Sequence, residues 1–223
     1  MPITQVIAID GPSGVGKSTV AKAVANHLGW TYLDTGATYR AVTLAWLEAD
    51  SDPSLLEQPT WLQNLGVDFQ AGDILLGTRR VNKAIREPEV TANASFVSAQ
   101  AAVRTYLTEL QRQIARKRPC ILDGRDIGTV VFPDALLKVF LTADDAVRAK
   151  RRWYQIGGDQ ANQTLDEVLT ALQERDRKDS SRTLAPLKPA KDAWTLETNT
   201  LSQEEVIDRI ECEARRRFKI NPA

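Results

Sequence analysis

The chain has 223 residues, of which 43% are hydrophobic and 26% are charged, a composition that suits one compact α/β protein with a sizeable core. Its 29 lysines and arginines balance 29 aspartates and glutamates, which argues against a protein that coats nucleic acid. Two cysteines form no disulfide framework, and the single histidine, His27, excludes any two-histidine metal site.

The N-terminal part of the chain alternates short apolar runs with helical patterns. We expect its first four elements in the order strand, helix, strand, helix, at residues 5–10, 17–28, 30–35 and 36–49. A loop with a short helix follows, and then a β-hairpin with its turn at Ala71-Gly72-Asp73. The stretch 78–86 adds a further short strand. Because this patch breaks the alternation, residues of roughly 60–90 are interpreted as an insertion.

The C-terminal part returns to the alternating pattern. Continuous apolar runs predict buried strands, and helical periodicity fills the intervals between them. The expected strands are 119–123, 136–143 and 192–198, and the expected helices are 98–117, 144–156, 165–179 and 202–218. Ser202 and Glu205 predict a capping box at the last helix. Alternation of this kind favours a mainly parallel sheet covered on both faces.

Residues Gly11–Ser18, "GPSGVGKS", match the phosphate-binding motif G-x-x-x-x-G-K-[ST] in full. The motif lies between a predicted strand and a predicted helix, which is its required context. Its glycines permit backbone conformations that turn N–H groups inward, and the helix adds its positive end. Lys17 is expected to reach the phosphates and Ser18 to ligate Mg²⁺. The motif indicates nucleoside triphosphate binding without specifying the reaction.

Charged residues gather where predicted strands end. Arg125 and Asp126 follow the strand 119–123, at the sheet edge where ligands of open α/β sheets bind. Asp123 occupies the position of a Walker-B-like aspartate, with a strand-end cap as the equally weighted alternative. Arg40 stands one turn into the helix that follows "YLDTGATY". These groups predict an anion-binding edge.

The segment "RAKRR" places three arginines, Arg148, Arg151 and Arg152, on one helix face. Like charges at this spacing repel one another, so the arrangement makes physical sense if an anion binds there. The alternative interpretation is a solvated basic face partly paired with Asp144 and Asp145.

The segment "ERDRKDSSR" spaces Arg175, Asp179 and Arg182 at i, i+4 and i+7. All three side chains would face one way if the helix continued through them. The alternative to a binding role is an intrahelical ladder of ion pairs.

Taken together, these segments resemble the bacterial cytidylate kinase family. "DGRDIGTVVFPDA" is more specific to the family than the phosphate loop, and the likeness extends in order over nearly the whole chain. The departures are mild: Thr35 replaces a frequent serine, and the "AGD" turn and "QIGGDQ" loop match weakly. The other matching segments are "IDGPSGVGKSTVAKAVA", "YLDTGATYRAV", "REPEVTANAS", "KVFLTA", "RAKRRW", "ERDRKDSSR", "APLKPAKDA" and "LET".

The resemblance implies a P-loop nucleoside monophosphate kinase fold with a mainly parallel five-stranded sheet. A small β-containing CMP-binding subdomain and a short lid would be inserted into the core. In this sequence the insertion would span about 37–104 and the lid about 146–164. The core would comprise about 1–36, 105–145 and 165–223.

The family also implies phosphoryl transfer from MgATP to CMP or dCMP in pyrimidine nucleotide metabolism. From the sequence itself we expect a cytoplasmic monomer, since nothing in it suggests an interface, a nucleic-acid partner or a membrane. Carried over by matching residues, Ser95, Arg104 and Asp126 would contact cytosine, and Arg175 and Asp179 the sugar. The CMP phosphate would lie against Arg40, Arg125 and Arg182, beside Thr35 and Tyr39. The residues implied for catalysis are Lys17, Arg125, Arg182, Arg148, Arg151 and Arg152. The residues implied for ATP are Gly11, Pro12, Ser13, Gly14, Val15, Gly16, Lys17, Ser18 and Thr19. Ser18 would hold Mg²⁺ through ATP, with Asp123 as a second candidate.

Two other functions remain open on the sequence. One is a P-loop kinase for another small acceptor, such as a different nucleotide or shikimate. The other is an NTP-binding regulatory switch, although "NKAI" at Asn82 has Ile85 where a guanine-reading motif needs aspartate. The chain starts directly with the first strand, no signal peptide is evident and no apolar stretch is long enough to span a bilayer, so we expect a cytoplasmic protein.

Overall fold

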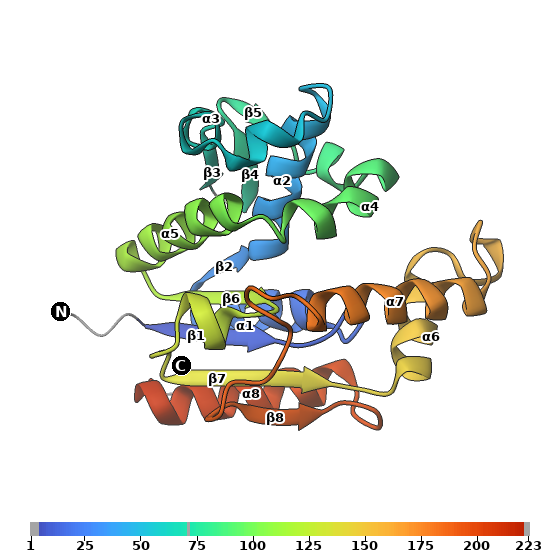
Figure 1. Cartoon of the computed structure of the whole chain (residues 1–223). Helices are drawn as coiled ribbons and strands as arrows, with labels where there is room; N and C mark the ends of the chain where they lie inside the picture. Colours follow the sequence, from blue (N-terminus) through green and yellow to red (C-terminus); the bar gives the residue numbers. More distant parts are fainter. Residues whose placement is uncertain (1–4, 71, 221–223) are drawn as a thin grey trace. The chain divides into compact units, whose positions relative to one another are not determined.

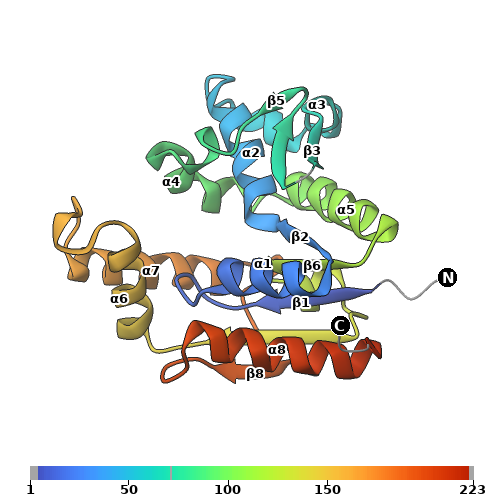
Figure 2. The same ribbon diagram turned by 180° about the vertical axis from the view of Figure 1, so that it is seen from behind.

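The computed structural model describes residues 5–70 and 72–220. The contacts between residues divide the chain into two compact units. Unit 1 comprises Met1–Tyr32 and Pro119–Ala223, and unit 2 comprises Leu33–Arg118. Both units are shown in Figures 1 and 2.

A five-stranded sheet with β1 at its centre organises unit 1, and the chain passes from unit 1 into unit 2 within strand β2 of this sheet (Figure 1). The strand order is β2-β6-β1-β7-β8, and β1 pairs in parallel with both β6 and β7. All five residues of β1 are buried, as the unbroken apolar run predicts. The predicted five-stranded, mainly parallel sheet is therefore confirmed. The strands are β1 (Val6–Asp10), β2 (Thr31–Asp34), β6 (Cys120–Gly124), β7 (Leu137–Thr142) and β8 (Trp194–Glu197).

Helices α1 and α8 cover one face of this sheet, as seen in Figure 2. Val20 and Val24 of α1 and Ile210 of α8 share one buried cluster with Ile7 and Ile9 of β1. The same spacing of apolar residues that predicted these helices therefore supplies the core contacts. The helices of unit 1 are α1 (Lys17–Leu28), η3 (Ile127–Val131), α6 (Asp145–Gln155), η4 (Gly158–Gln160), α7 (Leu165–Ser180) and α8 (Gln203–Phe218).

Local signals determine where these helices begin and end. The predicted capping box of Ser202 and Glu205 is present at α8, and Thr164 and Glu167 form another at α7. Gly29 ends α1 in the left-handed conformation with φ of 66°, which a glycine adopts without strain.

Unit 2 contains a three-stranded antiparallel sheet in the order β3-β4-β5, with helices around it. The hairpin of β3 and β4 and the short strand in 78–86 are both confirmed, while the predicted turn residue Ala71 lies outside the described residues. The elements of unit 2 are α2 (Thr35–Leu47), η1 (Pro53–Glu57), α3 (Pro59–Asn64), β3 (Val67–Gln70), β4 (Asp73–Leu76), β5 (Arg79–Arg80), η2 (Ala84–Arg86), α4 (Pro88–Val97) and α5 (Ala101–Lys117).

Helix α4 was not predicted from the sequence, although two signals for it exist. Pro88 occupies its first turn, where a missing N–H costs nothing, and Val90, Ala94 and Val97 recur at helical spacing and are buried. The many small polar residues between them hide the periodicity.

Helix α5 packs against α2 and α3, so its contacts place it in unit 2. The family resemblance implies that the core resumes at about residue 105, whereas the contacts group all of α5 with unit 2. The reason is that the apolar face of α5, which includes the buried Val103 and Leu107, packs within unit 2. The functional division into core, CMP-binding insertion and lid stays a prediction.

A first prediction concerns Gly11, the residue that opens the phosphate loop. Its φ is 149°, and a Cβ there would lie 2.2 Å from the backbone oxygen of Leu141. Gly11→Ala should therefore lower the free energy of unfolding by at least about 3 kcal/mol, measured by urea denaturation.

Gly72→Ala serves as the control, because Gly72 also has a positive φ, 90°, but a Cβ there meets no atom within 4 Å. It should cost only the conformational strain, about 1–2 kcal/mol. Equal losses in the two variants would contradict the role of the Leu141 contact.

Candidate active site

The phosphate loop connects the carboxyl end of β1 to the start of α1. Gly11, Gly14 and Gly16 all have positive φ values, 149°, 75° and 95°. Gly16 is the N-cap of α1 and brings no side-chain cap to the first N–H groups of the helix. The loop and the helix end are thus arranged as an anion-binding concavity. This is the geometry that the sequence motif predicts.

Lys17 is the charged residue of the phosphate-binding motif itself, and its exposed fraction is only 6%. Its Nζ donates to the backbone oxygen of Pro12 at 2.6 Å. Burial, and then the neighbouring charge of Arg125, lower the pKa of Lys17 well below its usual range. An anion in the loop would relieve both effects, because it replaces lost hydration and offsets the repulsion.

Ser18 and Asp123 meet beside the loop. The Ser18 hydroxyl donates to one carboxylate oxygen of Asp123 at 2.7 Å, and the Tyr32 hydroxyl donates to the other at 2.9 Å. Asp123 therefore acts as a partner of the phosphate loop and not simply as a cap at the end of β6.

A hydroxyl and a carboxylate are oxygen ligands of the kind Mg²⁺ prefers, and Mg²⁺ sites on nucleotides need few protein ligands. The Ser18 and Asp123 pair fits that ion. Among the described residues, no group of three or more His, Cys, Asp or Glu side chains forms a separate metal site.

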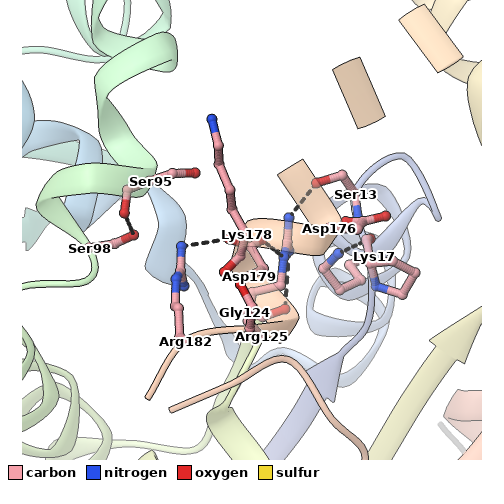
Figure 3. A network of polar contacts seen from close by, with 12 residues as sticks. Ser13, Lys17, Ser95, Ser98, Gly124, Arg125, Asp176, Lys178, Asp179 and Arg182 are labelled. Carbon is pink, nitrogen blue, oxygen red and sulfur yellow. Dashed lines mark hydrogen bonds and ion pairs between the residues drawn. The ribbon is translucent and has the colours of Figure 1, made fainter. Parts of the chain in front are cut away.

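Ser13 connects the phosphate loop to three charged side chains, of which Figure 3 shows Asp176 and Arg125. Its N–H donates to Asp176 of α7 at 2.9 Å, and its backbone oxygen accepts from Arg148 of α6 at 2.6 Å. Its Oγ accepts from Arg125, which follows β6, at 2.8 Å. The loop is therefore held from three elements through one residue that is 4% exposed. Asp176 was not among the residues singled out from the sequence.

The three arginines of α6 do not share one open basic face as the sequence analysis supposed. Arg148 is 4% exposed and is paired with Asp145 and Asp176. Arg151 donates to Thr198, while Arg152 is exposed. The repulsion expected along the helix is removed for Arg148 by carboxylates from two helices, one of which is the predicted partner Asp145.

Asp179 forms ion pairs with Arg125 and Arg182, the two arginines of this region for which the family resemblance implies a contact with the CMP phosphate. This carboxylate is 2% exposed and accepts from Arg125 Nε at 2.9 Å and from Arg182 Nη2 at 2.5 Å (Figure 3). The expected i, i+4, i+7 face is wrong in one respect, because α7 ends at Ser180 and Arg182 lies beyond it. Asp179 thus combines a local pair with Arg182, three residues further on, and a tertiary pair with Arg125, while Arg175 stays half-buried on α7.

At the end of β6, Asp126 is 5% exposed and begins the short helix η3. The N–H groups of the next two residues, Ile127 and Gly128, donate to Asp10 at 2.9 and 2.7 Å. Burial raises the pKa of Asp10 to about 6, even though these N–H groups lower it. Asp10 was not predicted as a site residue, although a carboxylate directly before Gly11 at a strand end was the available signal.

Within unit 2, Arg40 lies over the first turn of α2. It donates to Asp34 at 3.0 Å, and Asp34 also caps the helix by accepting from Ala37 N–H at 2.9 Å. A Cβ on Gly36 would lie 3.0 Å from Arg40 Nη1. The missing side chain at Gly36 therefore leaves the room in which this guanidinium lies. Thr35, the first residue of α2, is buried.

A second cation of unit 2, Arg104, is 6% exposed on α5. It donates to the Ser98 backbone oxygen at 3.0 Å and lies 5.3 Å from the ring centroid of Tyr39. The Ser98 hydroxyl donates in turn to the Ser95 oxygen. The structure therefore brings Tyr39, Ser95 and Arg104 into one connected group, and their roles in binding a substrate stay predictions.

Comparisons with known proteins agree with these features. A model of the cytidylate kinase family matches residues 7–216. A cytidylate kinase from Thermosipho melanesiensis is 47% identical over 204 residues, covering 92% of this chain and 94% of that protein. One from Exiguobacterium sibiricum is 46% identical over 216 residues, with 92% and 94% covered.

Two solved structures show the fold alone, because their sequences are distant. An uncharacterized protein from Eubacterium ventriosum has a TM-score of 0.56 at 14% identity, covering 96% of this chain and all of that one. TT1252 from Thermus thermophilus has a TM-score of 0.50 at 17% identity, covering 97% and 98%. In the part of the chain that the structure describes, every helix is too short or too polar to cross a bilayer.

A second prediction tests the contacts around Ser13. Asp176→Asn should lower the free energy of unfolding by about 2–3 kcal/mol, because it leaves the buried Arg148 with only Asp145 as a carboxylate partner. Urea denaturation measures the change.

Glu174→Gln on the same helix removes the same charge from an exposed pair with Arg177. It should leave the unfolding midpoint unchanged. Similar midpoints for the two variants would show that the Asp176 contacts do not stabilise the loop.

Proposed function

The chain belongs to the cytidylate kinase family, and from this we propose that it transfers the γ-phosphoryl group of MgATP to CMP or dCMP, forming ADP and CDP or dCDP. Full-length matches to cytidylate kinases support the acceptor. The phosphate loop supports the donor. We propose a cytoplasmic monomer that uses free nucleotides.

One contact, between Arg125 and Ser13, gives this proposal its strongest support. Arg125, which follows the sheet strand β6, donates to Ser13 of the phosphate loop at 2.8 Å. A guanidinium that suits a phosphate is therefore held directly beside the loop that suits the phosphates of ATP. Two phosphates bound this close together are in the arrangement that in-line transfer requires.

During transfer of the phosphoryl group, negative charge shifts between the phosphate oxygens, and side chains and N–H groups of this chain supply positive charge at those places. In the proposal, Lys17 and the N–H groups of the loop hold the β- and γ-phosphates of ATP. Arg148, Arg151 and Arg152 belong to the lid region and stabilise the transferred group. Mg²⁺, held by Ser18 through ATP and near Asp123, would neutralise phosphate charge when bound. The acceptor is already an anion, so positioning is the main task and no histidine base is needed.

We assign the acceptor contacts by unit. In unit 1, Arg125 and Arg182 would bind the CMP phosphate, Arg175 and Asp179 the sugar, and Asp126 the cytosine. In unit 2, Arg40 would bind the phosphate beside Thr35 and Tyr39, and Ser95 and Arg104 the cytosine. The family resemblance supports each position. The ion pairs of the buried Asp179 with Arg125 and Arg182, and of the half-buried Arg40 with Asp34, support these assignments because they hold the guanidiniums in defined orientations.

The decisive experiment is a coupled assay of ADP release with ATP, Mg²⁺ and each nucleoside monophosphate in turn. The proposal expects CMP and dCMP to give the highest kcat/KM. Faster turnover with another nucleotide, or with shikimate, would establish the alternative of a kinase for a different acceptor. ADP release that no acceptor accelerates would instead favour the regulatory switch.

A third prediction concerns base selection by Asp126. Cytosine presents an amino donor to a carboxylate where uracil presents an acceptor, so Asp126 should attract the first and repel the second. Asp126→Ala should reduce the CMP-over-UMP ratio of kcat/KM by about 5- to 150-fold, corresponding to about 1–3 kcal/mol. Steady-state assays with both acceptors measure it. If Asp126 only orients Arg125, both acceptors will slow by similar factors and the ratio will not change.

A fourth prediction concerns the room beside Arg40. Gly36→Ala places a methyl group 3.0 Å from Arg40 Nη1 and 3.2 Å from Asp34 Oδ1, so the Arg40–Asp34 pair has to shift. KM for CMP should rise about tenfold, equivalent to about 1.4 kcal/mol. The melting temperature should change little, because the preference of a helix for alanine over glycine, up to about 1 kcal/mol, offsets the shift of the Asp34 cap.

The affinity for an ATP analogue is the internal control for this variant. It should not change, since Gly36 and Arg40 are assigned to the acceptor. A fall in melting temperature with an unchanged KM for CMP would contradict the assignment of Arg40.

A further inference from the structure

The backbone that follows Asp126 is an unusual short helix whose first N–H groups need a partner. In η3, the N–H groups of Val130 and Val131 both donate to the Asp126 oxygen, at 2.9 and 3.2 Å. This single π-type turn leaves the N–H groups of Ile127 and Gly128 outside its own hydrogen bonds. In a buried turn, such groups cost free energy unless an acceptor faces them.

Asp10, the last residue of β1, provides that acceptor. One carboxylate oxygen accepts from Ile127 N–H at 2.9 Å and the other from Gly128 N–H at 2.7 Å. Asp10 is 5% exposed and lies opposite Gly124 in the register of β1 and β6. One rigid carboxylate, anchored in the central strand, therefore orients two successive peptide groups directly after Asp126.

The space beside Gly128 is occupied as well. A Cβ on Gly128 would lie 3.2 Å from the Lys138 side chain and 3.4 Å from an oxygen of Asp10. Lys138 is 5% exposed and is paired with Asp192 at 2.8 Å. A side chain at position 128 would therefore press on both Lys138 and Asp10.

We propose that Asp10 is a positioning residue for base selection, which orients the Asp126 carboxylate by fixing the peptide group that follows it. The inference rests on the proposed role of Asp126 in contacting cytosine. The peptide planes on the two sides of Asp126 together set the direction in which its side chain leaves the backbone, and Asp10 holds the plane that follows it. Rotation of that plane moves the carboxylate away from a base that it must meet at hydrogen-bond distance.

A role in stabilising the turn alone explains less well why residue 10 is an aspartate. A buried carboxylate is a costly way to close a turn, and burial raises the pKa of Asp10 to about 6. Two bonds from one planar group, however, fix an orientation that a single neutral acceptor leaves free. Assays at about pH 8 keep Asp10 ionised, so that both bonds are present in the parent enzyme.

The test compares Asp10→Asn, Asp126→Ala and the double variant, using kcat/KM for CMP and for UMP. An asparagine keeps one acceptor and turns an N–H group toward the other donor. Asp10→Asn should therefore reduce the CMP-over-UMP ratio by about 3- to 10-fold. In the Asp126→Ala background the same change should have no further effect on the ratio, because Asp10 acts through Asp126. The dissociation constant of a non-hydrolysable ATP analogue should change less than about 3-fold, well under 1 kcal/mol.

Asp52→Asn is the matched control, because Asp52 is also a carboxylate that caps a short turn by accepting a backbone N–H, that of Ser54 in unit 2. It should leave the ratio unchanged. Both acceptors are assayed on the same sample, so any unfolded fraction cancels in the ratio. Gly128→Ala is a second variant that disturbs the turn with Asp10 intact, and it should lower the ratio in the same direction.

The outcomes separate this inference from the proposed function. If Asp126→Ala shifts the ratio and Asp10→Asn and Gly128→Ala do not, the positioning role is wrong and the base-contacting role stands. If Asp126→Ala leaves the ratio unchanged, the base-contacting role itself fails. A shift by Asp10→Asn that persists in the Asp126→Ala background, or a large loss of affinity for the ATP analogue, would also overturn the inference, because Asp10 would then act by another route.

Discussion

Positive charge buried beside the phosphate loop is the constraint on which the rest of this structure depends. Lys17 and Arg148 are 6% and 4% exposed, and neighbouring Arg125 adds to the cost of keeping Lys17 charged. Such groups can be buried only where carboxylates face them, since an unpaired buried charge is far more costly than a paired one. Asp176 and Asp179 of α7 supply that partnership to Arg148 and Arg125, and the charges of Asp123 and Asp176 favour the charged form of Lys17. Helix α7 therefore has to pack where it does for the loop to keep its charge.

The partnership leaves the loop itself available to an anion. The carboxylates bind the guanidinium groups and Ser13 N–H, while the first turn of α1 has no side-chain cap. Phosphates entering this concavity would meet N–H groups and Lys17 that are already in place. Preorganised charge of this kind stabilises a transferring phosphoryl group without reorganisation at the moment of reaction.

The parallel sheet explains how so few strands bring these groups together. Strands β1 and β6 are neighbours in register, so the residues at their carboxyl ends emerge side by side. One strand ends in Asp10 and the phosphate loop, and the other ends in Asp123, Arg125 and Asp126. The Ser18 contact to Asp123 and the Asp10 contacts to Ile127 and Gly128 both cross between these two ends. Ligands of open α/β sheets bind at this edge for the same reason.

The sequence by itself determined the alternating strands and helices, the phosphate loop and the family, because each depends on local patterns of apolar residues, glycines and short motifs. It also grouped Arg175, Asp179 and Arg182, although as neighbours on one helix, and that helix in fact ends at Ser180. Only the tertiary structure decided which charges neutralise one another. Asp176 with Arg148, and Asp10 with the turn after Asp126, join residues 28 and more than 100 positions apart. Such pairs follow from the packing of helices and strands, and no local spacing in the chain encodes them.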